Sequence, residues 1–108
     1  MLSLALMAGA HWLRENAFAS IGFCVEAHFA TLPADDRHLI DWLKTEPGVV
    51  AHTVHVKRFG VDRKSLRVIF IQSRNVIKQD RPFPNLDAQC AQLGYLGPDV
   101  TFRDCAAP

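Results

Sequence analysis

Three side chains with possible metal or acid–base chemistry alternate along one predicted strand. Cys24, Glu26 and His28 occupy every second position there, so they point to the same face of a sheet. Thiolate, carboxylate and imidazole groups all bind metals. Neighbouring side chains of this kind are, however, about 7 Å apart on a strand, too far for compact coordination. We therefore expect no metal site and no cofactor, and interpret these residues as part of a polar surface.

The next predicted strands add residues to that surface. Arg67 and Ile69 alternate with apolar residues that should face the helices, so they fall on the same face as Glu26. Arg67 can then pair with Glu26 across two strands. The resulting hypothesis is a ligand pocket formed by Cys24, Glu26, His28, His55, Arg67 and Ile69. A register slip of one residue would replace His55 with His52.

A small enzyme is the alternative interpretation of this surface. Histidine titrates near neutral pH, so His28 and Glu26 could serve as an acid and a base. With five histidines in the chain, one near a carboxylate is common by chance. The sequence contains no phosphate-binding glycine loop, Ser-His-Asp ordering or H-E-x-x-H motif. We therefore favour non-enzymatic binding and assign no catalytic residue.

A basic segment raises a third hypothesis. Residues 57–81 hold eight basic and two acidic residues, although the whole chain has a net charge of only +1. Four of the basic residues flank a predicted hairpin tip and could bind phosphates: Lys57, Arg58, Arg63 and Lys64. Few aromatic residues accompany them, so nucleic acid is a less favoured partner than a protein or a small ligand.

The cysteines and the amino-terminal end bear on location. Three cysteines without C-x-x-C spacing predict free thiols and hence a cytoplasmic protein. The apolar start is too short for a membrane span and lacks the positive region of a signal peptide. We expect a helix at 1–17, with Met1 and Met7 both open as the native start.

The remaining elements follow from hydrophobic periodicity. We predict strands at 21–31, 49–56, 66–71 and 100–103. A helix opens at 32–36 and continues along the stripe Leu39, Ile40 and Leu43, and another starts at Asn85. A twelve-residue basic loop at 73–84 precedes the second helix. The run 66–71 is apolar on both faces, which is typical of an inner strand.

This order predicts one α+β domain spanning 1–108. Its core at 20–103 follows the ferredoxin-like β-α-β-β-α-β pattern, an antiparallel sheet with two helices on one face, and the helix at 1–17 is an addition. The architecture resembles that of the dimeric α+β barrels, and Glu46-Pro47-Gly48-Val49 resembles their helix-to-strand junction. Two helices cover only one face of the sheet, so either the helix at 1–17 or a second copy must cover the other face. The resemblance implies the second case, a homodimer in which two sheets face each other. We expect a module that binds a partner or a small ligand on its open sheet face.

Overall fold

The computed structural model describes residues 20–73 and 83–105. The predicted helix at 1–17 and most of the predicted basic loop lie outside these ranges, so both remain predictions. The described chain is an α+β structure with an open sheet and two α-helices.

The sheet has four antiparallel strands. They are β1 (Ser20–His28), β2 (His55–Phe59), β3 (Ser65–Ser73) and β4 (Arg103–Asp104). Their spatial order is β2-β3-β1-β4, which places β3 and β1 in the middle. The prediction that 66–71 forms an inner strand is therefore confirmed.

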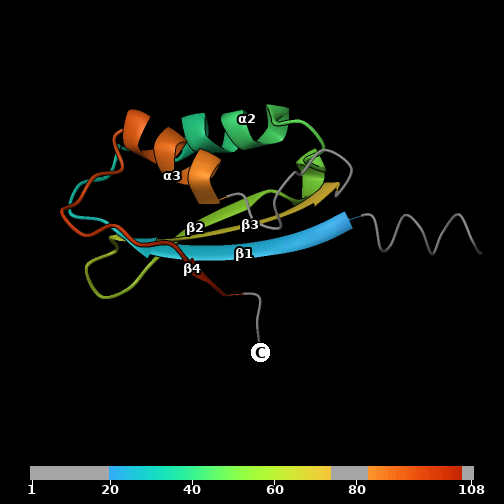
Figure 1. The fold of residues 1–108 in the computed structure, drawn as a ribbon. Coiled ribbons are helices and arrows are strands. Elements are labelled where there is room, and N and C mark those ends of the chain that lie inside the picture. The colour runs from blue at the N-terminus through green and yellow to red at the C-terminus, as the bar shows by residue number, and fades with distance from the viewer. Residues whose placement is uncertain (1–19, 74–82, 106–108) are drawn as a thin grey trace, which may run out of the picture.

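Both helices, α2 (Arg37–Thr45) and α3 (Phe83–Gln92), cover the same face of the sheet (Figure 1). Alternate residues of β1 and β3 point toward them, and Leu39 and Leu43 of α2 close the core from the other side. Cys90 of α3 is 1% exposed, as its place on an apolar stripe predicts. The buried residues of the two inner strands are Phe23, Val25, Ala27, Leu66, Val68 and Phe70.

The first strand of the predicted hairpin begins later than its apolar run indicates. Residues 51–53 form a short 3-10 helix, η1 (Ala51–Thr53), and β2 starts after it. The Thr53 hydroxyl donates to the carbonyl oxygen of Val50 at 2.6 Å and accepts the N–H of Ile71 at 2.9 Å. A side chain thus replaces backbone pairing here, which the run of β-branched residues alone does not reveal.

The first sheet helix also begins later than predicted. Pro33 and the two aspartates were expected in its first turn, but α2 starts at Arg37 with Asp36 at the N-cap position. The Asp36 side chain makes no capping hydrogen bond. The Asp35 carboxylate instead accepts the N–H of Arg37 at 3.0 Å. The carboxylate of Asp36 is left for tertiary contacts.

The end of α3 directs an aromatic residue into the core. The N–H of Gly94 donates to Ala91 O at 3.2 Å, and the N–H of Tyr95 donates to Cys90 O at 2.9 Å. This is a Schellman motif, and the φ of +100° at Gly94 is the left-handed conformation it requires. Tyr95 is consequently 2% exposed, with its ring 5.4 Å from that of Phe29.

Candidate functional site

The face of the sheet opposite α2 and α3, which we call the open face, carries the residues predicted for a ligand pocket. Cross-strand pairing aligns Cys24 with Ile69 and Ile69 with His55. Glu26 is aligned with Arg67 in the next row. The register thus puts His55 on the open face. The side chains on this face include Cys24, Glu26, His28, His55, Lys57, Phe59, Ser65, Arg67, Ile69, Ile71 and Arg103.

One row of charged side chains crosses all four strands of the open face. The register aligns Lys57 with Arg67, Arg67 with Glu26, and Glu26 with Arg103. We call these four residues the charged row. It holds three cations and one carboxylate. Residues paired in this way have neighbouring side chains on one face, so a ligand near the row is close to all four charges.

Arg67 is held on two sides. Its Nε and Nη2 atoms each lie 2.7 Å from Oε2 of Glu26, which confirms the predicted pair. Its guanidinium carbon lies 5.0 Å from the centroid of the Phe59 ring, a distance at which a cation is attracted to an aromatic face. The Arg67 side chain is still 41% exposed, whereas that of Glu26 is 16% exposed. A fixed and partly exposed guanidinium therefore lies at the centre of the open face.

His28 does not pair with Glu26. Its Nδ1 lies 3.0 Å from Oγ of Ser65, and its Nε2 lies 3.4 Å from Oδ2 of Asp62. The chain contains no Ser-His-Asp ordering, yet the hairpin brings these three types together because Ser65 is aligned with His28. The contacts of His28 with Ser65 and Asp62 connect the hairpin turn to the end of β1. It also has the connectivity by which a histidine can activate a serine hydroxyl.

A disulfide joins Cys24 to Cys105, which makes the prediction of three free thiols wrong. The last strand was expected at 100–103, but β4 comprises only two residues, and the disulfide directly follows it. The N–H of Cys105 donates to the carbonyl oxygen of Cys24 at 2.7 Å. An odd cysteine count, with the partners 81 positions apart, gives no sequence signal for this bond. The cytoplasmic location remains a prediction, but free thiols no longer support it.

The four basic residues predicted at the hairpin tip do not converge. Lys57 lies on the open face, whereas Arg58 points to the helix side and pairs with Asp36. Arg63 and Lys64 lie in the exposed turn between β2 and β3, with Arg63 at a φ of 58°. A phosphate site made of all four side chains is therefore not assembled in this structure.

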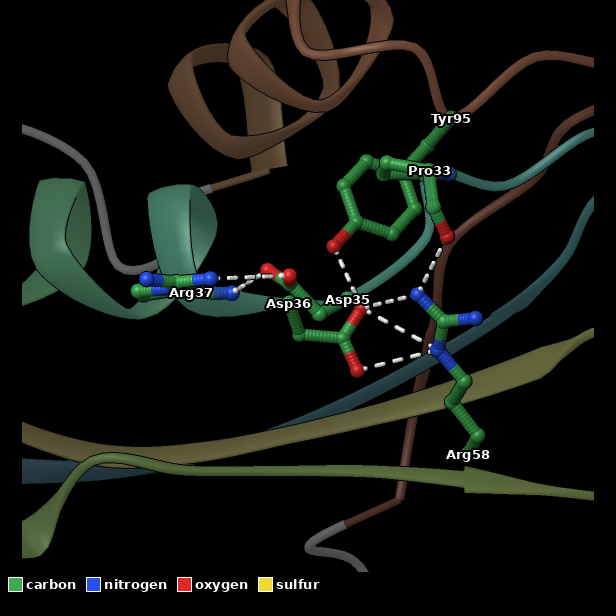
Figure 2. A network of polar contacts seen from close by, with 6 residues as sticks. All are labelled: Pro33, Asp35, Asp36, Arg37, Arg58 and Tyr95. Atoms are coloured by element: carbon green, nitrogen blue, oxygen red, sulfur yellow. Dashed lines mark hydrogen bonds and ion pairs between the residues drawn. The ribbon is translucent and has the colours of Figure 1, made fainter.

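A second polar cluster lies on the helix side of the sheet, where Figure 2 shows it from close by. Arg58 donates from Nε and Nη2 to the Asp36 carboxylate at 2.9–3.2 Å, and from Nη2 to the Pro33 carbonyl oxygen at 2.7 Å. The Tyr95 hydroxyl donates to Asp36 Oδ1 at 2.5 Å. Asp36, Arg58 and Tyr95, which we call the helix-side cluster, thus connect three chain segments. Sequence patterns did not reveal the cluster because its members are 22 to 59 residues apart.

In residues 20–73 and 83–105, no group of three or more His, Cys, Asp or Glu side chains is placed to hold a metal ion. None of the described helices has the length and apolarity to cross a membrane. Comparison of the chain with family models, curated proteins and solved structures finds no match.

Proposed function

We propose that this protein is a non-enzymatic module that pairs with a second copy of itself and binds a small ligand on the open face. The observation that carries the proposal is the two-sided character of β3. On its helix side Leu66 and Phe70 are each 1% exposed, but on its open side Ile69 and Ile71 are 41% and 38% exposed in the single chain. Burial of exposed isoleucine in an interface stabilises association, because it removes apolar area from water.

The fold supports this mode of pairing. The strand order β2-β3-β1-β4 and the two helices on one face support a ferredoxin-like arrangement. Two such sheets, packed with their open faces together, would form a dimeric α+β barrel with the ligand between them. The charged row and the two isoleucines would then line the shared interior.

The solution mass, measured by light scattering, tests the pairing. We expect the wild-type protein to have twice the mass of one chain, and Ile69→Lys to have the mass of a single chain. The matched control is Val61→Lys, because Val61 is a fully exposed apolar residue in the hairpin turn. It should leave the mass unchanged. A single-chain mass for the wild type, or a dimer unaffected by Ile69→Lys, would refute the pairing through this face.

A second candidate function is ester hydrolysis. It is favoured by the contacts of His28 with Ser65 and Asp62 and replaces the predicted His28–Glu26 pair. The expected signature is hydrolysis of p-nitrophenyl acetate that is lost in Ser65→Ala and in His28→Ala. Activity equal to that of either variant would remove this candidate and leave the binding module.

A further inference from the structure

The fixed geometry of Arg67 indicates the chemical class of the ligand. Glu26 accepts from one edge of the guanidinium, and Phe59 supports its plane. A side chain held in this way loses little conformational entropy when a ligand binds to its remaining edge. Carboxylate and phosphate groups match the planar donors of a guanidinium. Arg67 is thus prepared for an anionic group.

The neighbouring cations strengthen this preference. Lys57 and Arg103 flank the pair of Arg67 and Glu26, and neither side chain has an ion-pair or hydrogen-bond partner among the described residues. The charged row therefore has an excess of two positive charges. Two open faces brought together would double that excess, so a bound anion would reduce the repulsion between them.

We propose that the charged row binds the carboxylate or phosphate group of a small ligand whose apolar body lies on Ile69. This inference rests on the proposed function, since it requires a ligand on the open face. Arg67 and Lys57 would hold the anionic group directly, and Arg103 would contribute from the other side of Glu26. Ile69 follows Arg67 on the same face of β3 and is 41% exposed, so an apolar group joined to the anion reaches it.

Two features make a small anion a better fit than single-stranded nucleic acid. Bases bind to sheets by stacking on exposed aromatic rings. On the open face Arg67 already covers the Phe59 ring, at 5.0 Å from its centroid. The carboxylate of Glu26 also lies within the row, where it would repel a continuous chain of phosphates.

An NMR titration of the wild-type protein tests the inference. The probes are octanoate, octyl phosphate, inorganic phosphate and a short oligothymidylate. We expect octanoate or octyl phosphate to shift the amide signals of Lys57, Arg67 and Ile69, and whichever binds more tightly identifies the anionic group. Inorganic phosphate should bind the same residues at least about tenfold more weakly, because it lacks an apolar body.

Two charge variants keep the test specific. Lys57→Ala removes an exposed cation of the charged row, and we expect it to weaken octanoate or octyl phosphate binding about tenfold. Lys44→Ala removes an exposed cation from α2, on the opposite side of the sheet, and should have no effect. Equal effects of the two variants, binding of oligothymidylate alone, or binding of none of the probes would overturn the inference.

The same samples separate the two proposals. A dimer that binds none of the probes would overturn the anion site but leave the module of paired sheets. A single chain that binds octanoate through Lys57 would keep the anion site and refute the pairing. A single chain that binds none of them would refute both.

Discussion

Two arginine–carboxylate pairs, one on each side of the sheet, differ in how completely their polar groups are satisfied. On the helix side, Asp36 accepts from Arg58 and from Tyr95, and Arg58 also donates to a backbone carbonyl. The side chain of Arg58 is 24% exposed, and that of Asp36 is 14% exposed. On the open face, one oxygen of Glu26 accepts a hydrogen bond from Arg67 Nε and forms an ion pair with Nη2, and the Arg67 side chain is 41% exposed.

The difference separates a structural pair from one available to a ligand. A partly buried pair that shares several hydrogen bonds is costly to break, because each group left behind lacks a partner. In the other pair the Arg67 side chain is 41% exposed. Solvent screening weakens such a pair, so Arg67 can bind a further partner at small cost. The helix-side cluster therefore locks β2 to the start of α2 and to the end of α3, whereas the charged row can respond to an added anion.

The largest expected effect comes from the disulfide at the edge of the open face. Reduction by a dithiol, or the double variant Cys24→Ser with Cys105→Ser, should lower the free energy of unfolding by about 4.5 kcal/mol. This is the chain-entropy value for an 81-residue separation. Because β4 has only two residues, Arg103 should then leave the charged row and weaken octanoate binding. Urea unfolding with and without dithiothreitol measures the first effect, and an unchanged midpoint would contradict it.

Removal of the partly buried Asp36 carboxylate should have the next largest effect. Asp36→Ala leaves Arg58 and the Tyr95 hydroxyl without their shared acceptor, and we expect a loss of about 2–3 kcal/mol in the free energy of unfolding. Asp35→Ala is the matched control, because Asp35 precedes Asp36 and pairs with Arg37 on the surface. It removes a surface ion pair and the acceptor of the Arg37 N–H, so its loss in urea unfolding should be less than about half that of Asp36→Ala. Equal losses would show that the helix-side cluster is not the structural pair.

Alkaline pH should weaken the helix side specifically. Burial, and then the hydrogen bond to Asp36, raise the pKa of Tyr95 well above its ordinary value of 10.0. Burial likewise raises the pKa of Cys90 from 9.0 to about 12. The folded state holds both protons more tightly, so stability is complete below pH 9 and falls as the pH rises above it. Urea unfolding at neutral and alkaline pH should show this fall, and Tyr95→Phe should reduce its slope above pH 10.

The smallest expected effect on stability concerns the pair of Arg67 and Glu26. Glu26→Gln removes a negative charge but keeps an oxygen that can accept from Arg67, so the free energy of unfolding should change by less than about 1 kcal/mol. Affinity for octanoate should rise, because the anion no longer faces a carboxylate within the charged row. Paired urea and NMR measurements check both statements. A fall in affinity would show that the charge of Glu26 is needed to fix Arg67.

Much of the sheet could be predicted because its signals are local. The alternation along β1 and the doubly apolar run of β3 determine which residues are buried, and from these follow the inner position of β3 and the pairing of Glu26 with Arg67. The boundaries of α2 and β2 were less accessible. They depend on single side chains, such as Thr53, that replace backbone hydrogen bonds.

The contrast between the two arginines could not be obtained from composition. Arg58 and Arg67 lie in the same basic segment, and only the register shows that they face opposite sides of the sheet. The partners of Arg58 come from loops distant in sequence, and Cys105 meets Cys24 only through β4. Long-range contacts of this kind leave no periodic pattern.

The distance along the chain between Cys24 and Cys105 also orders the events of folding. The β2–β3 hairpin closes over a few residues and can form early, whereas the outer side of β1 must wait for a segment about eighty residues downstream. Until then β1 has unpaired backbone groups at the edge of the sheet, and strands from other chains can pair with them. The yield of refolded protein should therefore depend on how soon disulfide formation holds β4 against β1.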